Sequence, residues 1–269
     1  MTIVVAFKVG DGLVMGADSA STMEDANGNY LNSYFNAEKL FHIVKGLPVG
    51  VMTFGLGGLA NRSISSLIND LRRRMSDQHS EWYVNPENFT VLDVVNRIKA
   101  FFYDELYHTQ FDGMEKAPPL GFLVGGFSSD SSSAEVWRLV MNDGACAEPN
   151  LSIPPDVPTT VVWDGQHEAI RRLVLGYSWD VVETLKSHGV DEKDALDLLS
   201  VNTPLVHASM PIQDAVDFVH YLIEVTCGYV RFCTGQATVA HPIDSAAITK
   251  HNGFKWIRRK HYYPADLNQ

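Results

Sequence analysis

Thr2-Ile-Val-Val-Ala-Phe-Lys-Val9 leads through a turn at Asp11-Gly12 into a second apolar run, Leu13-Val-Met-Gly-Ala17, directly ahead of Asp18. β-Branched and aromatic residues favour strands, and an Asp-Gly pair between two such runs predicts a β-hairpin. Thr2 follows the initiator methionine, so removal of Met1 would expose its α-amine. A free α-amine titrates near pH ~7.7–8, and Thr2 would then carry a nucleophile and a base together. The alternative is that Thr2 only begins the strand.

Composition limits the classes of protein to consider. The 269 residues are 45% apolar and 20% charged, which is enough to bury one sizeable core in a single domain spanning 1–269. The net charge of −11 disfavours a nucleic-acid partner. No apolar run reaches the ~20 residues of a membrane span, so we expect no membrane association and a cytoplasmic location.

Cysteines and histidines give no sign of a disulfide framework or a metal site. Cys146, Cys227 and Cys233 form no Cys-x-x-Cys pair, and we expect reduced thiols. Ten histidines are scattered without zinc-like spacing, and we interpret His207, His220 and His241 as structural. We therefore expect neither a metal nor an organic cofactor.

Periodicity gives the order of the remaining elements. Apolar residues at helical spacing predict an amphipathic helix over 58–75, and Thr90 with Asp93 predicts the start of a second helix. Strands are expected at 121–127 and 135–140, separated by a serine loop, and 148–160 is expected to be a loop. Further helices are predicted around 168–175, 179–187 and 191–199, then a long helix capped by Ser209, and finally a strand pair over 243–257.

The first 22 residues closely resemble, in motif and spacing, the N-terminal hairpin of proteasome β subunits, which are N-terminal nucleophile (Ntn) hydrolases. By this resemblance Asp18 corresponds to the catalytic aspartate of the family. Lys39, in Asn36-Ala-Glu-Lys39, corresponds to the lysine that pairs with it. A nearby ammonium lowers the proton affinity of the threonine hydroxyl, and a carboxylate holds that ammonium in place and charged.

A glycine cluster supplies the expected oxyanion donor. In Val51-Met-Thr-Phe-Gly-Leu-Gly-Gly-Leu-Ala-Asn-Arg62 a predicted strand runs into glycines and then into the helical pattern. The resemblance selects the Gly57 N–H, with Gly55 and Gly58 as alternatives. An N–H at a strand-to-helix turn suits this role because it is unpaired within the helix and the helix dipole favours negative charge.

The sequence departs from the family at three positions, one of which is Ala20, where the family has an arginine beside its first aspartate. Where proteasome β subunits carry Gly-Ser-Gly, the corresponding stretch Val161-Val-Trp-Asp-Gly165 puts Asp164 in place of the serine. Asp164 either anchors the α-ammonium or a water, or caps the following helix. A second aspartate of the family has no clear match between Cys227 and Asp244. Some of the chemistry around the nucleophile must therefore differ.

The resemblance implies a four-layer αββα sandwich, in which two stacked antiparallel sheets lie between helical layers, with an extra helical insertion at about 177–206. It implies a bacterial proteasome-related threonine hydrolase that cuts amide bonds in peptides or unfolded protein as a homo-oligomer, in a ring or related closed array. An ATP-dependent unfoldase is a candidate partner.

Three other functions stay open. One is a small-molecule amidohydrolase of the same fold, and another is an inactive assembly subunit, for which retention of Met1 would speak. The third is a ligand-binding domain in which Thr2 is coincidental.

Overall fold

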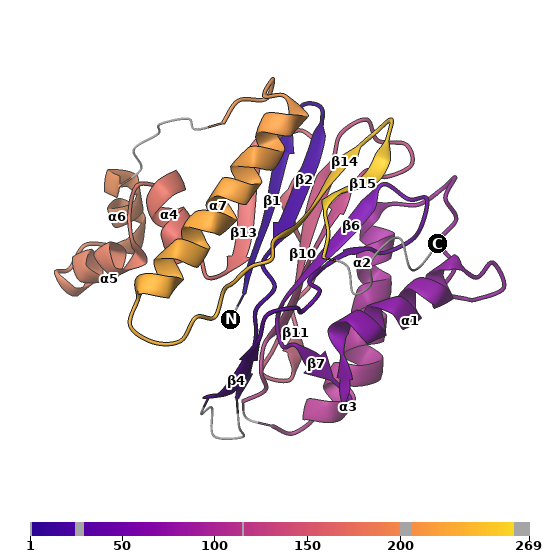
Figure 1. Ribbon diagram of the computed structural model, residues 1–269, viewed down its shortest axis with the longest axis horizontal. Helices are drawn as coiled ribbons and strands as arrows, with labels where there is room; N and C mark the ends of the chain where they lie inside the picture. Colours follow the sequence, from indigo (N-terminus) through magenta and orange to yellow (C-terminus); the bar gives the residue numbers. More distant parts are fainter. Residues whose placement is uncertain (1, 25–29, 115, 200–205, 261–269) are drawn as a thin grey trace.

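The computed structural model describes residues 2–24, 30–114, 116–199 and 206–260. Two antiparallel sheets lie face to face, and helices cover the outer face of each sheet (Figure 1). The predicted α+β class is confirmed.

The first sheet has five strands in the order β13-β1-β2-β14-β15. Its centre is the predicted N-terminal hairpin of β1 (Ile3–Val9) and β2 (Gly12–Ala17). The other strands are β13 (Thr160–Gly165), β14 (Asp244–Thr249) and β15 (Gly253–Arg258). Because β13 pairs with β1, a strand from the middle of the chain lies beside the N-terminal segment.

The second sheet has six strands. Its main path runs β11-β10-β9-β6-β5, and β12 pairs with β10. The strands are β5 (Leu40–His42), β6 (Val49–Gly55), β9 (Leu120–Gly126), β10 (Glu135–Asn142), β11 (Ala145–Cys146) and β12 (Asn150–Ile153).

Side chains of β1 alternate between two cores. Val4 and Ala6 pack into the core between the sheets, whereas Ile3, Val5 and Phe7 belong to an outer core beneath helix α7 (Ile212–Phe232). A strand buried on both faces has no polar side to present to water. This explains why its sequence is a continuous apolar run.

The helices divide between the two outer faces (Figure 1). The second sheet is covered by α1 (Ile64–Ser76) and α2 (Val91–Lys99), the latter continued by the π-helix η1 (Ala100–Tyr107) and by α3 (His108–Phe111). On the first sheet α7 is joined by α4 (Glu168–Val174). Figure 1 shows α5 (Trp179–Ser187) and α6 (Glu192–Leu199) beside α4, away from the sheets.

Some helix starts differ from the sequence prediction. The helix expected over 58–75 begins at Ile64, because residues 58–63 form a tight hairpin of β7 (Gly58–Leu59) and β8 (Arg62–Ser63). Ser209 does not cap α7, which begins at Ile212 after Pro211. Thr90 does cap α2, as predicted, and its reciprocal hydrogen bonds with Asp93 form a capping box.

Two more segments add to the prediction. The stretch expected to be a loop at 148–160 contains β12. The proposed insertion at about 177–206 contains α5 and α6, and residues 200–205 lie outside the described residues. A second small hairpin, β3 (Ser21–Glu24) with β4 (Tyr30–Tyr34), projects from the sheets just after Asp18 (Figure 1).

All three cysteines are free, as expected. Within the described ranges, none of the helices combines the length and the apolar character that crossing a membrane requires.

Candidate active site

Thr2 lies at the start of β1 and is 3% exposed. Its carbonyl oxygen accepts a hydrogen bond of 2.6 Å from the Gln166 N–H. Gly165 allows this close approach, because it has a φ of +98° and a Cβ built on it would lie 1.9 Å from the Thr2 oxygen. The end of β13 therefore fixes the position of Thr2, and Met1 lies outside the described residues.

Asp18 is fully buried where the chain leaves β2. Its Oδ1 accepts a hydrogen bond from the Ile3 N–H at 3.0 Å, and its Oδ2 accepts from the N–H groups of Ala20 at 2.9 Å and Ala240 at 3.2 Å. Three backbone donors compensate the loss of water around the carboxylate. Asp18 thus ties the start of β1 to the end of β2.

Lys39 precedes β5 and is 6% exposed. Its Nζ donates to Asp18 Oδ1 at 2.6 Å, which makes a buried ion pair. Burial lowers the pKa of Lys39 from its ordinary value of 10.5, while the Asp18 carboxylate favours the charged form and limits the decrease. The sequence-predicted pairing of these two residues is present in the structure.

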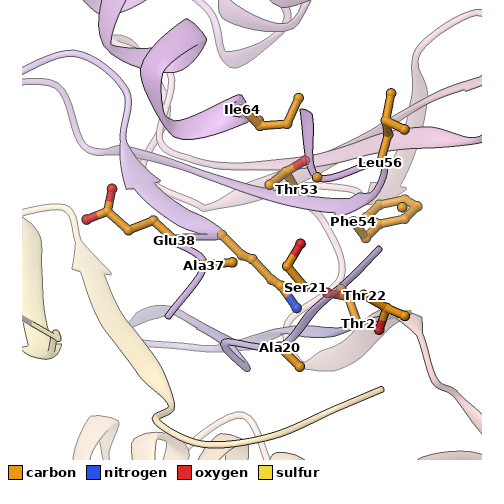
Figure 2. Close-up of a pocket in the computed structure, with 13 residues that line it drawn as sticks. Thr2, Ala20, Ser21, Thr22, Ala37, Glu38, Thr53, Phe54, Leu56 and Ile64 are labelled. Carbon is orange, nitrogen blue, oxygen red and sulfur yellow. The ribbon is translucent and has the colours of Figure 1, made fainter. Parts of the chain in front are cut away.

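Thr2, Lys39 and Gly57 line one small cavity of about 40 Å³ (Figure 2). Ser21 and Thr22 of β3 and Thr53 of β6 are also part of its wall. The candidate nucleophile and the lysine of the buried ion pair therefore border the same space.

Gly57 follows β6, and its carbonyl accepts a hydrogen bond of 3.3 Å from the N–H of Ile64. A Cβ at Gly57 would lie 2.7 Å from Ser21 Oγ, so only glycine fits there without movement of Ser21. The expectation that Gly57 sits at a helix N-terminus is wrong, because the β7–β8 hairpin separates it from α1. Gly57 can still donate its N–H, but without help from the helix dipole.

The two alternative glycines differ in position. Gly55 also lines the cavity, with a φ of +85° and with Pro119 O 2.2 Å from the position of a Cβ. Gly58 lies in β7 and lines a neighbouring pocket instead. Gly57 and Gly55 therefore both belong to the wall of the cavity that Thr2 lines.

Asp164 does not line the cavity of Thr2. It lies on β13 opposite Val4 and forms an ion pair with Arg138 in a separate, open cavity of about 460 Å³. Burial raises its pKa to about 6, and the opposing effect of Arg138 is smaller. The helix-cap interpretation is also wrong, since His167 occupies the N-cap position of α4.

Sequence reasoning missed a second buried ion pair near Asp18. Lys260 pairs with Asp244, and its Nζ donates to Ser19 Oγ at 2.6 Å. No local pattern joins residues 16 positions apart across β14 and β15. Sequence reasoning also missed Thr53. It could have been noticed as the polar residue that follows two valines at alternate positions, Val49-x-Val51-x-Thr53, on one face of a strand.

The three histidines considered for a metal site contact different partners. His220 Nε2 lies 2.7 Å from Ser245 Oγ, His241 Nε2 lies 3.2 Å from Glu224, and His207 Nδ1 lies 2.8 Å from Ser209 Oγ. No group of three or more potential ligands that could hold a metal is found in the described ranges.

No family model and no curated protein matches this chain. Among solved structures, the chain is similar to the Anbu (Gly-1) mutant from Hyphomicrobium sp. strain MC1. The two share 15% identity at a TM-score of 0.47, over 97% of this chain and 86% of that chain. Both values are low, so this likeness says nothing about activity.

Proposed function

We propose that the protein is a threonine-type Ntn hydrolase that cleaves amide bonds, with Thr2 as the nucleophile after removal of Met1. The observation that carries the proposal is the shared cavity of about 40 Å³, which Thr2 lines together with Lys39, the partner of the buried Asp18. Lysine is almost never fully buried unless paired. A buried lysine that lines the same cavity as a candidate nucleophile is a typical arrangement for activating a weak nucleophile.

In the proposed reaction, Thr2 Oγ attacks the amide carbonyl carbon and its proton passes to the Thr2 α-amine. The new C–O bond gives a tetrahedral oxyanion, to which the Gly57 N–H donates a hydrogen bond. Collapse breaks the C–N bond, and the leaving amine takes the proton from the α-ammonium. Water then attacks the resulting ester and gives one proton to the α-amine. The ester C–O bond to Thr2 Oγ breaks, Oγ takes that proton back from the α-ammonium, and the acid is released.

Asp18 and Lys39 act on the hydroxyl of Thr2 in this scheme. The Lys39 ammonium stabilises the alkoxide that develops on Oγ, and Asp18 keeps that ammonium oriented through the bond of 2.6 Å. We leave Asp164 out of the catalytic set, because it lines another cavity and is paired with Arg138.

The proposal extends to the architecture. We assign the paired sheets and their covering helices to the αββα Ntn hydrolase fold, as one domain over 1–269. A cytoplasmic homo-oligomer, in a ring or closed array, is proposed on the sequence resemblance alone. Peptides or unfolded chains are the proposed substrates, and an unfoldase partner is proposed on the same basis.

A small-molecule amidohydrolase is the second candidate, and the size of the cavity favours it. About 40 Å³ accommodates only a few water-sized groups. A short acyl group fits this space, whereas a long side chain requires the wall to move.

A panel of substrates separates these candidates. The wild-type protein and Thr2→Ala should be compared on several fluorogenic peptides and on small acyl amides. The proposal predicts hydrolysis by the wild type and loss with Thr2→Ala. Turnover of peptides supports a peptidase, and turnover of small amides alone supports the second candidate. Absence of all hydrolysis by protein that has lost Met1 would contradict the proposal.

A further inference from the structure

Two hydroxyl groups on the wall of the Thr2 cavity have no hydrogen-bond partner. In the described part of the chain, four buried side-chain polar atoms lack a partner, and two of them, Thr22 Oγ1 and Thr53 Oγ1, border this cavity. Thr53 is 5% exposed. A buried hydroxyl without a partner costs free energy, so such groups are rare unless a ligand or water completes them. Their coincidence at one small cavity points to a ligand.

The position of Thr53 on β6 indicates that packing does not explain its hydroxyl. Val49 and Val51, on the same face of the strand, pack into the outer core beneath α1 and α2, and Thr53 continues their row. Valine has nearly the same shape as threonine, so packing alone does not call for a hydroxyl here. Figure 2 places Thr53 and Thr22 with Thr2 around the cavity.

Charged groups in the wall are already paired. Lys39 is bound to Asp18 at 2.6 Å, and Glu38 accepts from Ser65 Oγ at 2.5 Å and contacts Arg259 at 3.4 Å. A charged substrate group would have to displace one of these partners. The space of about 40 Å³ is also too small for a long side chain. The cavity therefore suits a short, neutral group that forms hydrogen bonds.

We propose that Thr53, assisted by Thr22, selects substrates whose acyl side carries a short hydroxyl-bearing side chain, such as serine or threonine. This inference rests on the proposed function and names its substrate class. The substrate hydroxyl satisfies Thr53 Oγ1 as the scissile carbonyl reaches Thr2. A valine side chain of the same shape leaves Thr53 without a partner after displacing water, and is disfavoured for that reason.

The test pairs a change in the substrate with a change in the protein. Two fluorogenic peptides differ only in threonine or valine before the scissile bond, and a third carries phenylalanine. The wild type should cleave the threonine peptide with a kcat/KM about tenfold above that of the valine peptide, as expected for one neutral hydrogen bond. Phenylalanine should be the poorest of the three.

Variants assign the preference to Thr53. Thr53→Val keeps the shape and should reduce the threonine-to-valine ratio to about one, while Thr53→Ser should keep most of it. Thr53→Val should also melt no lower than the wild type, because it removes an unpartnered hydroxyl. As a matched control, Thr226→Val deletes a buried hydroxyl that donates to Leu222 O in α7 at 2.8 Å, and should leave the ratio unchanged.

The outcomes separate this inference from the proposed function. Cleavage with no preference for threonine over valine overturns the inference and leaves the proposed function standing, as does a preference that survives in Thr53→Val. Absence of cleavage of all three peptides and of small hydroxyl-bearing acyl amides overturns both.

Discussion

Removing Asp18 from the buried ion pair should destabilise the protein more than removing Lys39. Asp18 accepts three backbone hydrogen bonds in addition to its ion pair with Lys39. Removing Lys39 leaves a carboxylate that still has three donors. Removing the charge of Asp18 leaves a buried ammonium without its partner, which is the more costly change.

Lys39→Met should therefore remain folded yet lose at least about a hundredfold in kcat/KM, whereas Asp18→Asn should lose activity and also about 3–5 kcal/mol of stability. Denaturant unfolding and amide hydrolysis measure the two effects. The double variant should be more stable than Asp18→Asn, because no unpaired ammonium remains. Full activity in Lys39→Met would rule out the assigned role.

Asp164 predicts a pH dependence of stability. Its folded pKa of about 6 exceeds the ordinary value of 3.8, so the folded protein binds more protons than the unfolded chain between these values. This group's stabilising contribution is full below pH ~4 and is lost as the pH rises through ~6, by at most about 3 kcal/mol.

Asp164→Asn should flatten the stability profile between pH ~4 and ~6, as measured by denaturant unfolding. Asp130→Asn, which changes an exposed carboxyl in the serine loop, should follow the wild type. An unchanged profile in Asp164→Asn would show that this carboxyl does not titrate as described.

Residue-scale prediction from the sequence succeeded for Thr2, Asp18 and Lys39 in the sense that the structure places them together. They are close because one hairpin and the next strand determine their positions. The catalytic role predicted for Asp164 stays a prediction, but the surroundings of its side chain could not be predicted from the sequence. Its ion pair with Arg138 joins β13 to β10, which belong to different sheets, and no spacing along the chain indicates that contact.

At the scale of elements, the turn at Gly165 positions the nucleophile. Gly165→Ala would place a Cβ 1.9 Å from the Thr2 oxygen at a φ of +98°. We expect a loss of activity together with a loss of stability larger than the ~1–3 kcal/mol of backbone strain alone. Peptide hydrolysis and thermal melting measure these two losses.

Gly189 offers a matched control for Gly165. It has a φ of +86°, but a Cβ there would meet no atom within 4 Å. Gly189→Ala should show the strain cost and keep full activity. Equal activity in the two glycine variants would contradict the role assigned to Gly165.

Helix and strand prediction succeeded where the signals are local. The Thr90–Asp93 capping box marks the start of α2 in the sequence, and the structure contains it. The β7–β8 hairpin was missed because Ala60 and Asn61 adopt φ of +52° and +59°, which their identities do not require. Ser209 resembles a cap, but its N–H and hydroxyl pair locally with His207.

At the scale of the whole molecule, the β3–β4 hairpin presents apolar side chains to solvent. Met23, Leu31 and Tyr34 are each about half exposed, with Leu31 at 58%. Adjacent exposed apolar residues on a projecting hairpin are typical of a binding surface. We expect this hairpin to contribute to the proposed homo-oligomer.

Light scattering after size exclusion should give a mass that is a multiple of 29.9 kDa. Leu31→Lys should lower this mass or weaken assembly, whereas Leu198→Lys, at a position that is 73% exposed on α6, should not. A monomer at all concentrations would contradict the expected assembly.

The central claim is that Thr2 is an active N-terminal nucleophile, and intact-mass spectrometry tests it most directly. The protein should be measured before and after incubation with an epoxyketone that carries a short side chain, since this reagent closes a ring with a hydroxyl and an adjacent free amine. The account predicts a chain without Met1 that gains one adduct on Thr2, and no adduct in Thr2→Ala. A chain that retains Met1, or a free Thr2 that stays unlabelled, would contradict it.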